Sequence, residues 1–176
     1  MNYFTPDLLT RINSLDEETS DKADDDWELA IKRYNRRMAR IKDKLPGGAR
    51  QFEDNPICLH DARLLRMARN GDSLVMVLET EPPAQSLVVL TFVMYAEPEI
   101  DRFALPGRSE SDWVEWEYEE WDVDRSGRCS FEVLFSNGWS VKLPVRDFHF
   151  VIGQQILPSG NGTAGRTSKK VVPQSA

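Results

Sequence analysis

The chain has 176 residues and a mass of 20.2 kDa, which is the size of one ordinary domain. Hydrophobic residues make up 40% of it and charged residues 29%, so the chain can bury a core and is neither wholly disordered nor embedded in a membrane. Its formal net charge of −7 disfavours nucleic acid as a partner, because phosphate groups would be repelled.

Two helices are predicted near the amino terminus. The first runs from Pro6 to about Leu15, with Thr5 as its N-cap. The second carries six apolar residues at alternating spacings of four and three, which is the pattern of one helix face. These residues are Trp27, Ile31, Tyr34, Met38, Ile41 and Leu45. Acidic residues precede this helix and basic residues fill its end, in the order that its dipole favours, and residues 45–48 (Leu-Pro-Gly-Gly) end it.

Beyond Gly48 the apolar pattern changes from helical to alternating, which predicts strands. The first hairpin turns at residues 70–71 (Asn-Gly). A two-residue loop of type I′ there places Met67 opposite Leu74 and brings apolar side chains together on one face. A three-residue loop would set Met67 against a serine, so the shorter loop is predicted.

A second Asn-Gly, at residues 137–138, gives the opposite result. A three-residue loop pairs Val133 with Val141, whereas a two-residue loop pairs Val133 with a lysine. Gly138 is therefore predicted to take the left-handed conformation of a G1 bulge. Further strands are predicted at residues 86–95 and 145–152.

Helices that precede strands indicate an α+β fold rather than a doubly wound parallel sheet. We expect two amino-terminal helices packed on an antiparallel sheet of about six strands. Residues 1–156 form this single domain, and residues 157–176 have the Gly, Ser and Pro content of a flexible tail.

The stretch from Ser109 to Asp124 is the most unusual segment, because it holds eight acidic residues, no basic residue and several aromatic ones. Its alternation slips at Glu119 and Glu120, which predicts a bulge or a strand break. Two interpretations are open: the aromatic rings line the core, or they anchor a basic protein partner that the carboxylates attract. The candidate protein-binding residues are Trp113, Trp116, Tyr118, Glu119, Glu120 and Trp121.

An alternative function is that of a small metal-dependent enzyme or ligand-binding protein. His60 and Asp61 are adjacent and have the residue types of a metal ligand or of an oriented general base, and His149 is the other histidine of the chain. This alternative requires the three side chains to converge. A His-Asp pair at the start of a strand also commonly makes local hydrogen bonds only.

No other motif in the sequence indicates a catalytic or cofactor-binding site. The sequence has no phosphate-binding Gly-Lys-Ser/Thr loop and no Gly-x-Ser-x-Gly nucleophile turn, so no cofactor is expected. Cys58 and Cys129 lie far apart and are predicted to be reduced. The amino terminus lacks the features of a secretory signal, which predicts a cytoplasmic protein.

Several short segments together resemble small bacterial proteins that are catalogued only as a domain of unknown function. They are the Tyr-Phe-Thr start at residues 3–5, the charged helix that closes at residues 45–46, Leu-His-Asp at residues 59–61, and residues 131–138. The acidic tryptophan-rich stretch followed by a hairpin is also similar to cytoplasmic immunity proteins. That similarity implies a non-enzymatic protein that binds a basic toxin.

Overall fold

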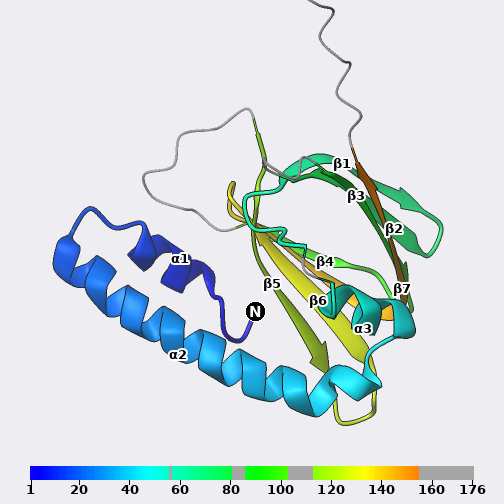
Figure 1. The fold of residues 1–176 in the computed structure, drawn as a ribbon, viewed down its shortest axis with the longest axis horizontal. Coiled ribbons are helices and arrows are strands. Elements are labelled where there is room, and N and C mark those ends of the chain that lie inside the picture. Colours follow the sequence, from blue (N-terminus) through cyan, green and yellow to red (C-terminus); the bar gives the residue numbers. More distant parts are fainter. Residues whose placement is uncertain (56, 81–85, 103–112, 155–176) are drawn as a thin grey trace, which may run out of the picture.

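The structure is a computed structural model that describes residues 1–55, 57–80, 86–102 and 113–154 (Figure 1). Within these ranges it combines helices with an antiparallel sheet, so the predicted α+β class is correct. The predicted tail, residues 157–176, lies outside the described residues. No helix in the described part of the chain is long and apolar enough to cross a membrane.

The helices all lie in the first third of the chain. They are α1 (Pro6–Ile12), α2 (Glu17–Ile41), the 3-10 helix η1 (Lys42–Lys44) and α3 (Gly47–Glu53). Thr5 caps α1 as predicted, since its side chain accepts a hydrogen bond from the Leu8 N–H at 3.2 Å. The expectation of two helices was wrong, because the chain forms α3 directly after Pro46. Ala49 and Phe52 of α3 are buried, which gives this short helix its packing face.

Seven strands are described, one more than the approximate number predicted. They are β1 (Arg63–Asn70), β2 (Ser73–Glu79), β3 (Ser86–Met94), β4 (Glu99–Arg102), β5 (Trp116–Val123), β6 (Cys129–Phe135) and β7 (Trp139–Gln154). The strand order is β1-β2-β3-β7-β6-β5, and β4 pairs with β7 beside this path. The long strand β7 joins the two halves of the sheet, because its first part pairs with β6 and its second part with β3.

The two hairpins had different outcomes. At the second, Val133 pairs with Val141 and Gly138 has φ +80°, as predicted. At the first, the loop does have two residues, but they are Gly71 and Asp72, so Met67 faces Met76 instead of Leu74. Among the residues of this turn only Gly71 has a positive φ, which is the pattern of type II′ rather than the predicted type I′.

A bulge interrupts the first hairpin farther from its turn. Met67 faces Met76 on the turn side of the bulge, and the register then slips between Leu64 and Arg66, so that Leu64 faces Leu78. The intervening Leu65 is left exposed. The bulge thus lets both Leu64 and Met67 pack against the core, while Leu65 between them stays outside it.

The sheet closes on itself where the segment before β1 meets the start of β5. The Asp61 N–H donates to the Trp116 carbonyl oxygen at 2.8 Å, and the Trp116 N–H donates to the Ala62 carbonyl oxygen at 2.9 Å. Further along, the Leu64 N–H donates to the Val114 carbonyl oxygen at 2.7 Å. Because both edges pair here, the sheet encloses its apolar side chains on one concave face.

The core fills this enclosure. Rings from four strands pack at centroid distances of 4.6 to 5.3 Å, within the usual range for aromatic pairs. They belong to Phe92, Trp121, Phe131 and Phe148. In Figure 1, α1 and α2 lie together on the outer side of the sheet beside β5, and α3 lies near β6 and β7.

The contact between α3 and β7 requires a glycine. A Cβ atom on Gly48 would lie 1.8 Å from the carbonyl oxygen of Phe148, far inside van der Waals contact. The neighbouring Gly47 has no such constraint, since the nearest atom to its Cβ position is an arginine side-chain nitrogen at 3.9 Å. Gly48 therefore sets how closely α3 approaches the sheet.

We expect Gly48→Ala to lower the free energy of unfolding by about 3 kcal/mol or more, because the backbones of α3 and β7 must separate. Gly47→Ala is the matched control, and it should be neutral or stabilising by up to about 1 kcal/mol through helix propensity. Urea denaturation of the two variants measures the difference. Equal stabilities would show that α3 does not pack on β7 in this way.

Candidate functional site

In the described part of the acidic aromatic stretch, residues 113–124, strand β5 contains a bulge, as predicted, but at Glu117 rather than at Glu119 and Glu120. Residues 109–112 lie outside the described residues. Trp116 faces Phe135 of β6, whereas Tyr118 faces Leu134, so Glu117 is the additional residue. The bulge changes which side chains of β5 point inward. It lets both Trp116 and Trp121 enter the core.

Two of the four predicted aromatic anchors are not on the surface. The exposed fraction is 0% for Trp116 and 1% for Trp121, so these two rings follow the core interpretation and no partner can reach them in this structure. Tyr118 is half-buried and packs on Phe4 and Trp27. Trp113 is 54% exposed, with the Arg63 guanidinium 4.1 Å from its ring centroid.

The Glu119 side chain also points inward, and its charge acts on Glu53 of α3. The Trp116 indole N–H donates to the Glu119 carboxylate at 2.5 Å. Burial raises the pKa of Glu119 despite this hydrogen bond. Burial first, and the nearby Glu119 charge second, raise the pKa of Glu53 in α3 to about 7. Two carboxyl groups with raised pKa values thus lie at the end of the core that α3 covers.

Glu120 points to the opposite face of β5 and holds the amino-terminal segment. Its carboxylate accepts backbone N–H groups of Asn2, Tyr3 and Phe4, each at 2.7 Å. With an exposed fraction of 4%, this carboxylate is an attachment point for the chain rather than a free surface charge.

Beside Glu120 lies a groove of about 540 Å³, here called the acidic groove. It runs across the outer face of β4, β5, β6 and β7, with the amino-terminal residues at one wall. Its carboxylates come from strands β4, β5 and β6 and from the residue that directly follows the end of β5. They are Glu99, Asp101, Glu120, Asp122, Asp124 and Glu132. Acidic residues of the predicted stretch therefore do share a concave surface.

Several acids of the groove are already paired. Asp122 accepts two hydrogen bonds from Arg37 of α2, at 2.8 and 2.5 Å. Asp124 accepts hydrogen bonds from Ser126 and Arg128, which hold its pKa well below the usual range. Asp101 makes no ion pair with any described residue, and the nearest Glu99 oxygen lies 3.7 Å from Lys142. The carboxylates of β4 are thus the least compensated part of the groove.

A second hollow, of about 460 Å³, lies between α2, the segment before β1, and β5. Aromatic rings and several polar side chains line it, and it is here called the aromatic hollow. The rings are those of Phe4, Trp27, Tyr34 and Tyr118; the polar side chains that matter here are His60, Glu117 and Glu119. A mostly apolar hollow with a few converging polar groups is the usual form of a ligand site.

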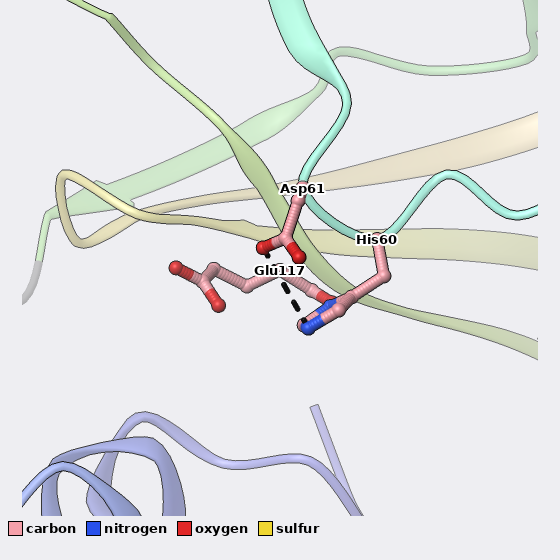
Figure 2. Close-up of side chains that lie close together, drawn as sticks. All are labelled: His60, Asp61 and Glu117. Atoms are coloured by element: carbon pink, nitrogen blue, oxygen red, sulfur yellow. Dashed lines mark hydrogen bonds and ion pairs between the residues drawn. The ribbon is translucent and has the colours of Figure 1, made fainter. Parts of the chain in front are cut away.

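At the wall of this hollow, three potential metal ligands come together. One donor atom from each of His60, Asp61 and Glu117 lies within 4.8 Å of the other two. Figure 2 shows His60 and Asp61 on the segment before β1 and Glu117 on β5. His149, which the sequence suggested as a third ligand, is not part of this group. It lies on β7 and contacts Asp147 at 3.3 Å.

Sequence reasoning named His60 and Asp61 but missed Glu117 as their neighbour, since that contact exists only through closure of the sheet. It also missed Glu99 and Asp101, which lie on a four-residue strand too short to give a pattern. No signal in the sequence distinguished Glu53 from the many exposed acids.

No protein-family model matches the sequence, and a search of curated proteins finds no relative. The resemblances to a bacterial domain of unknown function and to immunity proteins therefore stay predictions.

We expect Trp121→Ala to lower the free energy of unfolding by about 3 to 5 kcal/mol, because it removes a ring from the centre of the core. Trp113→Ala is the control on the same segment, and the loss of its exposed ring should change stability by about 1 kcal/mol or less. Thermal and urea unfolding measure both. A small effect of Trp121→Ala would place that ring outside the core.

Glu53 should make stability depend on pH. Its carboxyl group ionises less readily in the folded protein than in the unfolded chain, so the free energy of unfolding falls as the pH rises from about 4.5 to about 7. Glu53→Gln removes this penalty and should stabilise the protein by up to about 3 kcal/mol at pH 8, with little effect near pH 4.5.

Urea denaturation at the two pH values tests this expectation. Asp25→Asn, on the exposed face of α2, removes a carboxylate that is not buried and should show no such difference. A Glu53→Gln variant with the same pH dependence as the original protein would contradict the raised pKa.

Proposed function

We propose that the protein is a non-enzymatic cytoplasmic binding protein whose acidic groove takes up a basic segment of a partner protein. The observation that carries this proposal is the convergence of six carboxylates in one concave surface of about 540 Å³. A groove of this size accommodates several side chains, and its negative charge favours lysine and arginine. A basic toxin, as in the immunity proteins that the sequence resembles, is one partner of this chemistry.

The groove also offers an aromatic anchor. Tyr95, in the connection between β3 and β4, lines it with an exposed fraction of 43%. Tyrosine is common among the residues that dominate binding energy at interfaces. It replaces Trp116 and Trp121 in the proposal, because those rings are buried.

The acids of β4, which are the least compensated in the groove, should govern the approach of the partner. Glu99 and Asp101 belong to a strand whose four residues are all exposed. At about 0.15 M salt the Debye length is about 8 Å, so their attraction acts at long range only at lower salt. Tyr95 acts at contact and should govern dissociation instead.

The test uses a short peptide of alternating lysine and serine and the same peptide with glutamine in place of lysine. Chemical shifts of the protein amides should change around Tyr95 and β4 with the basic peptide only. The double variant Glu99→Gln/Asp101→Asn should lower the association rate at low salt by at least about threefold and flatten its salt dependence. Tyr95→Ala should mainly speed dissociation.

The matched control is Asp24→Asn/Asp25→Asn, which removes the same charge from the exposed face of α2. An equal fall in association rate with this control would mean that net charge, not the groove, attracts the peptide. Shifts that map to α2 or to the aromatic hollow would place the binding surface elsewhere. Glu119 and Glu120 are unsuitable for the test, because one accepts a hydrogen bond from the buried Trp116 and the other holds the amino-terminal segment.

A further inference from the structure

The three donor groups at the wall of the aromatic hollow have the spacing of a metal site. His60 Nε2 and Asp61 Oδ1 are 3.7 Å apart, and one ring nitrogen of His60, one carboxylate oxygen of Asp61 and one of Glu117 all lie within 4.8 Å of one another. Nitrogen and oxygen ligands at about 2.0–2.2 Å from a tetrahedral zinc ion are about 3.4 Å from one another. Small rotations of the side chains therefore suffice to bring all three onto one ion.

The tautomer of His60 suits a metal ligand. His60 Nδ1 is 2.7 Å from the backbone carbonyl oxygen of Glu117, and because a carbonyl oxygen only accepts, Nδ1 carries the hydrogen and donates it. Nε2 is left to face the carboxylate of Asp61 (Figure 2). Metal-bound histidines usually donate their other ring N–H to a carbonyl or carboxylate in this manner.

The backbone that carries these ligands is held in place, and the imidazole ring rests on a neighbouring ring. The imidazole of His60 stacks on Tyr118 with a centroid distance of 5.4 Å. Asp61 has a φ of +64°, and its N–H is bonded to the carbonyl oxygen of Trp116. Glu117 is the bulge residue of β5 and has an exposed fraction of 5%. The three ligands thus belong to the closure of the sheet rather than to a free loop.

We propose that His60, Asp61 and Glu117 bind one divalent transition-metal ion such as Zn²⁺. One imidazole and two carboxylates suit Zn²⁺ or Mn²⁺, whereas Mg²⁺ and Ca²⁺ prefer oxygen ligands alone. Three protein ligands leave a coordination position for water or for a small ligand. Since His60 and Glu117 also line the aromatic hollow, the ion lies at its wall and apart from the acidic groove.

The chain contains its own control for this proposal. His149 and Asp147 of β7 form the same pair of residue types, with Nε2 and Oδ2 3.3 Å apart, and both side chains are exposed. Among the described residues no third ligand joins them within the same distance. An exposed His-Asp pair alone therefore predicts no comparable affinity.

The experiment is calorimetric titration of Zn²⁺ into the untagged full-length chain after treatment with a chelator. We expect one equivalent to bind and the melting temperature to rise with Zn²⁺. Asp61→Asn should weaken binding at least about tenfold, because loss of even an outer-shell partner commonly has an effect of that size. Asparagine tolerates positive φ, so this variant should keep the fold. His60→Gln and Glu117→Gln should weaken binding as well.

His149→Ala should keep the original stoichiometry and affinity, and Mg²⁺ should give no comparable heat. Circular dichroism without metal confirms that each variant is folded. Zinc binding that Asp61→Asn leaves unchanged, that His149→Ala abolishes, or that lacks a defined stoichiometry would overturn the proposal. Metal binding is tested independently of peptide binding at the acidic groove, because the variants that test the groove change β4 and the connection that precedes it.

Discussion

The closure between the segment before β1 and the start of β5 is the constraint on which the rest of the structure depends. Three backbone hydrogen bonds join residues 61–64 to residues 114–116, at 2.7 to 2.9 Å. They satisfy strand edges that would otherwise face water or another chain. They also enclose the aromatic core and bring a histidine and an aspartate against a glutamate that is more than fifty positions away in the sequence.

Next to this closure, the bulge at Glu117 distributes the side chains of β5 between two environments. Trp116, Glu119 and Trp121 contact the interior, while Glu120 and Asp122 face the amino-terminal segment and α2. A strand without the bulge would alternate strictly and could not direct both tryptophans inward. The same irregularity that completes the core therefore separates the acidic groove from the aromatic hollow.

The two candidate sites differ in their physical character. The acidic groove is polar, open to solvent and partly neutralised by its own cations, so it suits a partner that is attracted by charge and bound at a few contacts. The site at the aromatic hollow is small and fixed by backbone bonds, so it suits an ion. Of the two, only the acidic groove is the kind of charged, protein-binding surface that the sequence suggested.

The sequence by itself determined the start of α1, the apolar face of α2, the α+β class and the hairpin at Gly138, because these depend on local periodicity, caps and turn chemistry. It identified β5 as unusual and the pair of His60 and Asp61 as candidate ligands, but it did not decide which tryptophans are buried or which carboxylate joins that pair. Those outcomes depend on bulges and on long-range closure of the sheet. A shift of one residue in a strand reverses every side chain, and only the pairing between distant strands fixes it.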